Sequence, residues 1–352
     1  MVDAPDDGAR PLDRPLPDVD ALEEEAVARL PEHVLSYFRG PTGAYGIPTE
    51  AERWSRLRFR PHVLRDTSRL SLATTVLGTD VASPVLVAPM AQQRAADQEC
   101  EVATARAVRR RGSLLGVSTN TGVRFADIHA AGAPWWFQVY VMDDRVMTAD
   151  LVQRAAAEGA TALVLTVDAP GTDPRRPDLE PRTWSERYGM QANLPGAEAG
   201  VFPATQRLSL DDVGWLHEVT GLPVVVKGVL RADDAVTCVD AGAAGIVVST
   251  HGGRCLTQST TSAEALPEVV AAVGDRTEVY VDSGLRTPEH VAAALCLGAL
   301  AVFLGRPVMW ALATGGAARV EDLLEGFDTQ LLRVLRSLGV GSLADLGPDL
   351  LV

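Results

Sequence analysis

The chain has 352 residues, 47% of them hydrophobic, and a formal net charge of −14. This charge argues against a nucleic-acid partner, because phosphates bind basic surfaces. The sequence has no run of eighteen apolar residues and so predicts no membrane-spanning helix. Residues 1–19 are acidic and proline-rich, lack the pattern of a signal peptide, and predict a disordered lead-in.

The four cysteines are Cys100, Cys238, Cys255 and Cys296, and their spacing is not that of a metal site. In a chain of this size without a secretion signal, they predict free thiols in a reducing compartment, which indicates a cytoplasmic protein. No metal is expected.

Short apolar runs alternate with amphipathic stretches from residue 85 onward. Each run is rich in Val and Leu on both faces, as a parallel strand buried on both sides should be. The runs span 85–90, 114–119, 136–141, 162–170, 223–229, 245–253, 278–284 and 301–307, and the amphipathic stretches include 100–111, 149–158, 232–241, 262–273 and 288–297. Eight strands with intervening helices predict an α/β fold, the (β/α)8 TIM barrel. A doubly wound open sheet is the alternative, but Ala88-Pro-Met-Ala follows the first run where that fold has a glycine-rich turn.

Flanking segments complete one predicted domain over residues 20–352. Residues 20–39 predict an N-terminal helix, and residues 318–345 predict one or two closing helices. The connection after the fourth run, at about 171–207, is long and only weakly periodic. Long loops of this kind are often lids or binding loops, so we expect it to border the active site.

Polar side chains stand at or after the ends of the apolar runs. In a TIM barrel the carboxyl ends of the strands meet at one face, and that face carries the active site. The polar groups are Ser118, Gln138, Tyr140, Thr166, Asp168, Lys227, Ser249, His251, Asp282 and Arg306. Any single one of these residues could instead have a purely structural role, as a buried histidine paired with a neighbour often does. Their repetition over separate strands favours a shared pocket.

Positive charge is concentrated at this face in an otherwise acidic chain. Of the 32 basic side chains, 31 are arginines and one is a lysine, Lys227, which ends an apolar run. Loops after the last two strands of TIM barrels commonly bind phosphate through backbone N–H groups, and arginines there add charge-assisted bonds. The residues in those loops are Ser283, Gly284, Arg286, Gly305 and Arg306. The sequence therefore predicts a phosphate-bearing ligand.

The chain resembles the FMN-dependent 2-hydroxy acid oxidases and dehydrogenases, the glycolate, lactate and mandelate group, from about Leu30 to Leu346. The matching stretches are Phe59-Arg-Pro-His-Val-Leu-Arg-Asp, Ala88-Pro-Met-Ala, Trp136-Phe-Gln-Val-Tyr, Leu165-Thr-Val-Asp-Ala-Pro, Leu222-Pro-Val-Val-Val-Lys-Gly, Val248-Ser-Thr-His-Gly-Gly-Arg and Leu304-Gly-Arg-Pro-Val-Met-Trp. The most specific of these signals is His-Gly-Gly-Arg after a strand, with Lys-Gly one strand earlier. The resemblance implies FMN as cofactor and oxidation of a small 2-hydroxy carboxylate to the 2-oxo acid.

The resemblance also implies roles for the catalytic residues. His251 matches the base that takes a proton from the substrate, either from the hydroxyl or from the α-carbon, and Asp168 matches the carboxylate that stabilises its charged form. Arg254 matches the guanidinium that binds the substrate carboxylate. Tyr37 and Tyr140 match two tyrosines that hydrogen-bond the substrate.

A second substrate arginine is implied after the Thr-Val-Asp motif. Counting without gaps places it at Arg175, whereas a one-residue insertion would place it at Arg176. Lys227 matches a lysine that stabilises the reduced flavin. The residues that match flavin-binding positions, or lie in the expected phosphate loops, are Pro89, Met90, Ala91, Ser118, Gln138, Thr166, Lys227, Ser249, Asp282, Ser283, Gly284, Arg286, Gly305 and Arg306.

Several positions depart from the family pattern. The usual Gln-Leu-Asp after His-Gly-Gly-Arg is Cys255-Leu-Thr257, the usual Asn before the histidine is Thr250, and the usual Asp-Gly-Gly is Asp282-Ser283-Gly284. Asn120 and Met90 stand where glycolate oxidases carry tryptophan and threonine. These departures leave open a larger or carrier-attached hydroxy acid as substrate, and a flavin-binding protein that has lost catalysis is a further alternative.

Oxygen is the expected electron acceptor. The long loop carries no extended apolar run, and Ala91 matches a position that is usually alanine in the oxidases of the family. A dehydrogenase with another acceptor is the alternative. Analogy with the family also implies a homo-oligomer, often a tetramer.

Overall fold

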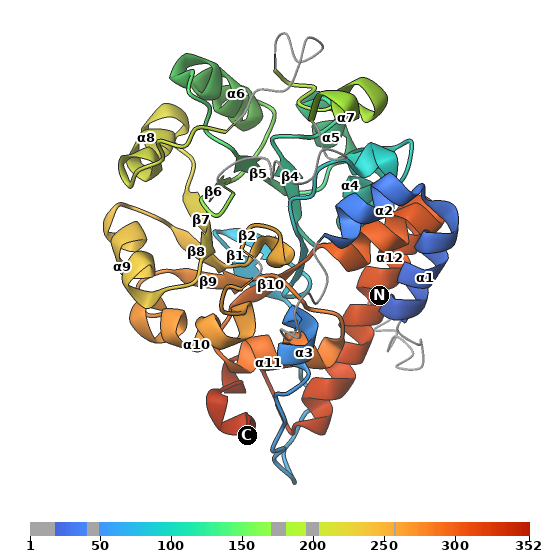
Figure 1. The fold of residues 1–352 in the computed structure, drawn as a ribbon. Helices are drawn as coiled ribbons and strands as arrows, with labels where there is room; N and C mark the ends of the chain where they lie inside the picture. Colours follow the sequence, from blue (N-terminus) through green and yellow to red (C-terminus); the bar gives the residue numbers. More distant parts are fainter. Residues whose placement is uncertain (1–17, 41–48, 170–180, 195–203, 257) are drawn as a thin grey trace, which may run out of the picture.

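The computed structural model describes residues 18–40, 49–169, 181–194, 204–256 and 258–352. Eight parallel strands close into a barrel in the order β10-β3-β4-β5-β6-β7-β8-β9 (Figure 1). The strands are β3 (Val85–Val87), β4 (Leu115–Ser118), β5 (Trp135–Val139), β6 (Leu163–Thr166), β7 (Val224–Val229), β8 (Gly245–Val248), β9 (Glu278–Val281) and β10 (Ala301–Leu304). Each lies within or overlaps one of the eight predicted runs, so the predicted (β/α)8 barrel is confirmed and the open sheet is excluded.

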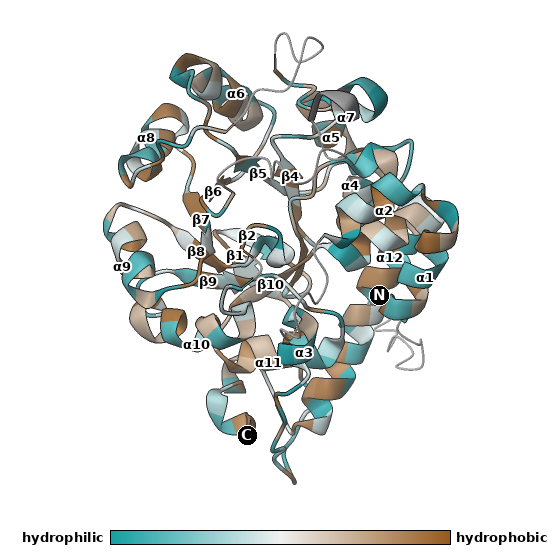
Figure 2. Ribbon diagram, in the orientation of Figure 1, coloured by the Kyte–Doolittle hydropathy of each residue, from teal (hydrophilic) through white to brown (hydrophobic). Residues whose placement is uncertain are grey.

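Helices surround the barrel and bury one apolar face against it, as the hydropathy colouring in Figure 2 shows. They are α4 (Cys100–Arg111), α5 (Phe125–Ala131), α6 (Arg145–Ala157), α8 (Asp211–Thr220), α9 (Ala232–Asp240), α10 (Ser262–Val273), α11 (Pro288–Cys296) and α12 (Arg306–Ser337). Local caps fix several starts: a capping box of Thr261 and Glu264 begins α10, and the Thr287 side chain caps α11.

A short hairpin closes the amino-terminal end of the barrel. Its strands are β1 (Thr74–Val76) and β2 (Thr79–Val81), and the sequence pattern did not predict them. Val76 and Val81 pack into the same buried cluster as the barrel-lining Trp136 and Tyr280. The backbone N–H of Leu77 also bonds Glu278, the first residue of β9. This end of the barrel is therefore filled by side chains of the hairpin and the strands.

The N-terminal segment forms two helices where one was predicted. They are α1 (Val19–Arg29) and α2 (Glu32–Arg39), separated at Pro31, which takes an extended conformation as the N-cap of α2. Asp18 and Val19, the last two residues of the predicted lead-in, belong to the first helix, because the Asp18 side chain caps α1 and Val19 is buried. Residues 1–17 of that lead-in lie outside the described residues. A short helix follows, α3 (Glu50–Trp54).

The closing helix starts at Arg306, twelve residues before the predicted start at 318. It is interrupted at Gly315 and Gly316, whose backbone is non-helical, and these glycines explain why the sequence pattern placed the start later. Short 3-10 turns at Leu343–Asp345 and Pro348–Leu350 complete the chain end. The sequence implied that the long connection has no regular structure of its own. The structure instead shows a helix within it, α7 (Pro181–Tyr188).

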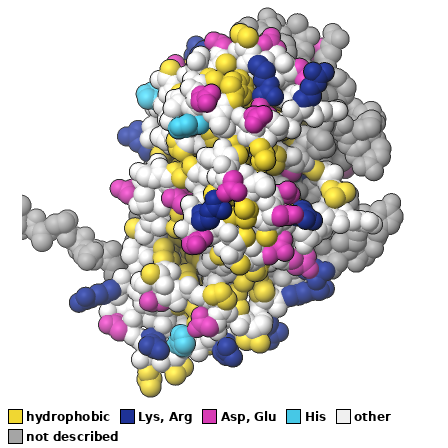
Figure 3. Space-filling model, turned by 90° about the vertical axis from the view of Figure 1, so that its left-hand side faces the viewer, with side chains coloured by type: hydrophobic (Ala, Val, Ile, Leu, Met, Phe, Trp, Pro, Cys, Tyr) yellow, Lys and Arg dark blue, Asp and Glu magenta, His cyan; other side chains and the backbone are white. Residues whose placement is uncertain are grey.

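Acidic and basic side chains are interspersed over the face that Figure 3 shows, with hydrophobic side chains scattered between them. Within the described ranges, none of the helices combines the length and the hydropathy needed to cross a bilayer.

Candidate active site

One cavity opens at the carboxyl ends of the barrel strands, with an empty volume of about 1020 Å³ that includes space open to solvent. Most of the predicted site residues line it, although they come from segments throughout the chain. These residues are Tyr37, Pro89, Met90, Ala91, Ser118, Gln138, Tyr140, Thr166, Lys227, His251, Arg254, Asp282, Ser283, Gly284, Arg286, Gly305 and Arg306. The strand ends therefore converge as expected.

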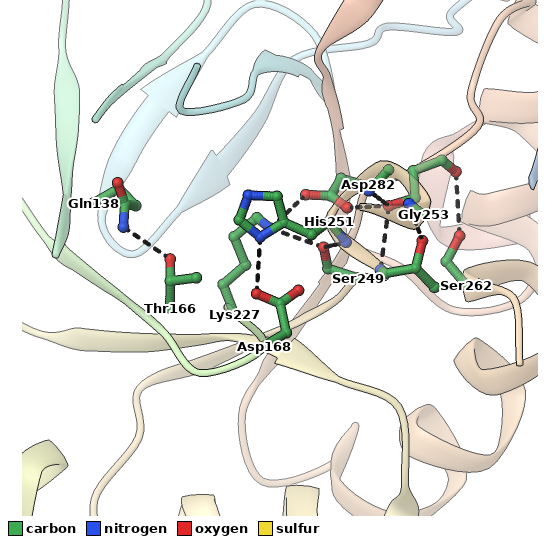
Figure 4. Close-up of polar contacts among 12 residues, drawn as sticks. Gln138, Thr166, Asp168, Lys227, Ser249, His251, Gly253, Ser262 and Asp282 are labelled. Carbon is green, nitrogen blue, oxygen red and sulfur yellow. Dashed lines mark hydrogen bonds and ion pairs between the residues drawn. The ribbon is translucent and has the colours of Figure 1, made fainter. Parts of the chain in front are cut away.

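Two predicted residues lie behind the cavity wall. Asp168 contacts His251, and Ser249 contacts Lys227 (Figure 4). Both hold a neighbour that does line the cavity. The candidate Arg175 and its alternative Arg176 lie outside the described residues.

The imidazole of His251 is held by a carboxylate that follows another strand of the barrel. Its Nδ1 lies 2.9 Å from Oδ1 of Asp168, which follows β6. Burial raises the pKa of Asp168, but the Lys227 charge and the hydrogen bond from His251 outweigh burial, and the net pKa is lowered. Asp168 therefore stays ionised at neutral pH and stabilises a protonated imidazole.

The single lysine, Lys227 on β7, is buried and lines the cavity. Its Nζ donates to Oγ of Ser249 at 2.8 Å and lies 3.3 Å from Oδ2 of Asp282. Burial lowers the pKa of Lys227, but the Asp282 and Asp168 carboxylates outweigh burial and raise it overall. Lys227 therefore carries a fixed positive charge at the cavity floor.

Arg254 lines the cavity where the last turn of α2 approaches it. Its Nη1 donates to the carbonyl of Tyr37 at 2.6 Å, and its Nη2 donates to that of Phe38 at 2.7 Å. The guanidinium lies over the Tyr37 ring, 5.3 Å from its centre. These contacts explain how the N-terminal segment, far away in sequence, contributes Tyr37 to the site. Burial raises the pKa of both Tyr37 and Tyr140, so their hydroxyls are neutral donors.

Two guanidiniums are gathered at another part of the cavity. Burial lowers the pKa of Arg286, and burial together with Arg286 and Arg254 lowers the pKa of Arg306 to about 9. The buried Nη1 of Arg286 has no hydrogen-bond partner among the residues that the structure describes. Adjacent buried cations with an unsatisfied donor fit an anionic group, because an anion would relieve both costs.

The glycine beside them leaves room for a close approach. Gly284 has φ +77, and a β-carbon there would lie 2.4 Å from Cβ of Glu50. The backbone therefore lies against α3 in a way that only glycine allows.

Hydroxyl and amide groups line the remaining wall between β4 and β6. Ser118 donates to Oε1 of Gln138 at 3.1 Å, and Nε2 of Gln138 donates to Thr166 at 3.0 Å. This chain of bonds fixes the orientation of the Gln138 amide, which is suited to the polar edge of a planar ring system.

The family model for FMN-dependent dehydrogenase matches residues 26–352. The chain belongs to this family. An L-lactate oxidase from Nostoc sp. is 38% identical over 320 residues, which are 85% of this chain and 87% of the relative. Glycolate oxidase 1 from Oryza sativa subsp. indica is 36% identical over 345 residues, or 92% and 93%. A crystal structure of mandelate oxidase with (S)-4-hydroxymandelic acid is 35% identical with a TM-score of 0.85, covering 95% of this chain and 98% of that one.

The protein is therefore an FMN-dependent oxidoreductase, and the cavity fits this cofactor. The buried guanidiniums of Arg286 and Arg306 could hold its phosphate, and Lys227 and the Gln138 amide could face the polar edge of its flavin ring. The relatives named above are all oxidases of 2-hydroxy acids by name.

Sequence reasoning missed residues that hold the site from behind. Glu50, on α3, accepts a hydrogen bond from Thr250 at 2.7 Å and two from Ser262. Trp54, on the same helix, donates from Nε1 to the carbonyl of Ser283 at 2.9 Å. Neither stands at the end of a strand, so position along the chain gave no signal for them.

Proposed function

We propose that the protein oxidises a 2-hydroxy carboxylic acid to the 2-oxo acid, with His251 as the base. The observation that carries this proposal is the His251–Asp168 pair at the wall of a cavity that also contains Arg254 and Lys227. FMN, when bound, supplies the acceptor for the two electrons that leave the substrate. A protein that had only retained flavin binding would have no use for an intact base beside an arginine.

His251 takes the substrate proton in this proposal. Because Asp168 occupies Nδ1, the nitrogen left for the substrate is Nε2. The lowered pKa of Asp168 keeps its carboxylate charged, so the pair stabilises the imidazolium that proton transfer creates. The same argument applies whether the proton comes from the hydroxyl or from the α-carbon.

Arg254 binds the substrate carboxylate. A guanidinium presents five N–H donors in a planar fork, which matches a carboxylate. The bonds to Tyr37 and Phe38 hold this plane at the cavity wall. Tyr37 and Tyr140 then orient the substrate through their neutral hydroxyls, and we assign the same substrate-binding role to Arg175.

Lys227 stabilises negative charge that develops on the cofactor during the reaction, because its charge is fixed there before the reaction begins. Arg286 and Arg306 hold the phosphate, together with the backbone at Ser283, Gly284 and Gly305. Asp282 and Ser249 support the lysine. The remaining contacts to the cofactor come from Pro89, Met90, Ala91, Ser118, Gln138 and Thr166.

The substrate wall supports a second candidate, a larger or carrier-attached hydroxy acid. Asn120 lines the cavity where glycolate oxidases carry a tryptophan, and the smaller amide leaves more room for the substrate side chain. We further propose that oxygen reoxidises the flavin to give hydrogen peroxide, in a cytoplasmic homo-oligomer.

The test is anaerobic mixing of the purified holoenzyme with a panel of 2-hydroxy acids that increases in size from glycolate to mandelate. Bleaching of the flavin absorbance by at least one acid supports the proposal, and the preferred size separates the two substrate candidates. His251→Ala should keep its FMN and lose bleaching by about 10²-fold or more. Bleaching by no acid, or an unimpaired variant, would reject the assignment.

A further inference from the structure

The backbone around the catalytic histidine has an unusual conformation. His251, Gly252 and Gly253 have φ values of 55°, 68° and 77°, three left-handed residues in succession. Ser283, which follows β9, is also left-handed, with φ 76°. Residues other than glycine rarely adopt this left-handed region of backbone conformation, and the strain persists only where the surrounding structure holds the backbone in place. His251 and Ser283 are both non-glycine residues, and both lie at the cavity.

Side-chain hydroxyls hold this turn. Oγ of Ser283 accepts the N–H of Thr250 at 3.2 Å and that of Gly252 at 3.0 Å. Oγ of Ser249 accepts the N–H of His251 at 3.0 Å. Oγ1 of Thr250 accepts the N–H of Gly253 at 3.2 Å. Four consecutive backbone N–H groups are thus bound by three hydroxyl oxygens. Figure 4 shows Ser249, His251 and Gly253 within this network.

Ser283 uses the full capacity of its hydroxyl. A hydroxyl has one donor and two acceptor positions. Both acceptor positions bind the histidine turn, and the donor bonds Oδ1 of Asp282 at 2.7 Å. Asp282 pairs in turn with Lys227, which donates to Ser249. The cavity floor and the histidine turn therefore belong to one hydrogen-bond network.

Glu50 closes the network from the N-terminal segment. One carboxylate oxygen accepts the Thr250 hydroxyl at 2.7 Å, and the other accepts Oγ and N–H of Ser262 at 2.9 and 3.1 Å. Because Thr250 donates to Glu50, its oxygen is oriented to accept from Gly253. The Glu50 carboxylate thus sets the direction of the Thr250 hydroxyl, which bonds the last residue of the turn.

We propose that Ser283 and Glu50 are positioning residues for His251. Through the Ser283 hydroxyl and the Thr250 hydroxyl that Glu50 orients, they hold the left-handed turn that presents the imidazole to the cavity. The inference rests on the proposed role of His251 as base. It also assigns a function to two departures from the family pattern, Thr250 and Ser283, which lie side by side and bind the same turn.

A substitution by glycine separates this role from a merely structural one. Ser283→Gly removes the hydroxyl and relieves the left-handed strain at the same position. If the Ser283 hydroxyl has no role in positioning the turn, the variant should melt at the same or a higher temperature and reduce its flavin at the wild-type rate. If Ser283 positions the turn, the flavin reduction rate should fall about 10- to 100-fold, because small misplacements of a catalytic group cost this much. The Kd for FMN should change much less.

Hydrogen exchange gives a readout that does not depend on turnover. The amides of Thr250 and Gly252 lose their hydroxyl acceptor in Ser283→Gly, so they should exchange several-fold faster, with or without FMN. Ser283→Ala also lacks the hydroxyl but keeps the strain. It should show the same faster exchange and a lower melting temperature than Ser283→Gly.

Glu50→Gln tests the other arm, with Glu52→Gln on the same helix as its control. Glu52 is exposed and contributes to a capping box, a role that glutamine also fills. We expect Glu50→Gln to slow flavin reduction and to shift the pH profile of that step, and Glu52→Gln to leave both unchanged. Wild-type reduction rates and exchange in both Ser283→Gly and Glu50→Gln would overturn the inference. A wild-type enzyme that no 2-hydroxy acid bleaches would instead reject the proposed function.

Discussion

A β-carbon placed on Gly228 would lie 2.6 Å from Cβ of Asp168. Gly228 follows Lys227 at a register shift of β7, with φ +112. The carboxylate that holds the His251 imidazole therefore occupies space that only glycine leaves open, and both residues of the Lys-Gly pair contribute to the site. Its lysine supplies charge, and its glycine admits Asp168.

Gly228→Ala should displace Asp168 and weaken its bond to His251. We expect flavin reduction by substrate to slow at least tenfold, because the imidazole loses its orientation and its counter-charge. The melting temperature should also fall, because both the clash and the left-handed backbone oppose a side chain here. Stopped-flow reduction and calorimetry of the holoenzyme measure the two effects.

Gly242→Ala is the matched control for this variant. Gly242 has φ +99, but a β-carbon there would meet nothing within 4 Å. It should therefore lose stability through backbone strain and keep the wild-type reduction rate. Equal rates in the two variants would show that Asp168 does not depend on the space at Gly228.

Lys227→Met should lower the reduction potential of the bound flavin and weaken its sulfite adduct. Both changes follow from losing a fixed positive charge where negative charge develops. The variant also leaves Asp282 buried without its cation, so its melting temperature should fall. The double variant Lys227→Met/Asp282→Asn removes that unpaired charge and should recover stability without recovering the potential. A potential equal to that of the wild type would place Lys227 away from the flavin.

The sequence predicted the barrel well because its strands are buried on both faces and so read as continuous apolar runs. The predicted runs extend past the strands, since 245–253 includes the whole His251 turn whereas β8 ends at Val248. The predicted run therefore included Ser249 to Gly253, where the backbone has already left the sheet. The Thr74–Val81 hairpin was missed because each of its strands has only three residues, too few for a periodic pattern.

The residues that gather at the cavity could be predicted where a charged or titratable side chain lies at or just after the end of a strand, as with Asp168, Lys227 and His251. Glu50 could not, because its partner Thr250 is 200 residues away and only the folded chain brings them together. The sequence marked Ser283 as a residue of a predicted phosphate loop and as a departure from the family pattern, but not as a partner of the His251 turn. Its role emerges from the direction of its hydroxyl, which no spacing rule encodes.

Arg306→Met should weaken the binding of FMN about 10- to 100-fold, the range expected for a lost hydrogen bond between charged groups. Riboflavin lacks the phosphate, so its affinity for the apoprotein should be the same in the variant and the wild type. Fluorescence titration of apoprotein with both ligands makes the comparison. An equal loss for both ligands would mean that Arg306 acts through the fold and not through the phosphate.

Asp168 should make the stability of the protein depend on acid pH. Its pKa is lowered in the folded state, below the unfolded value of about 3.9. Its contribution to the free energy of unfolding is therefore complete above the unfolded pKa and is lost as the pH falls through the folded pKa. Urea unfolding of the wild type and Asp168→Asn should differ most above about pH 5 and converge in stronger acid. A difference that grows on acidification would contradict the lowered pKa.

Oxygen should reoxidise the substrate-reduced enzyme within about a second of mixing with air-saturated buffer. An oxidase that turns over at about the median enzyme rate or somewhat more slowly needs reoxidation this fast. Ala91 lines the cavity beside Pro89 and Met90. Stopped-flow absorbance follows the return of the oxidised flavin, and a coupled peroxidase assay should find one peroxide for each flavin reoxidised. Ala91→Gly is the informative variant, because it removes one methyl from the cavity wall and should change the oxidation rate while leaving the reduction rate within a few-fold. Reduced flavin that persists for minutes in air would identify a dehydrogenase that passes its electrons to another acceptor.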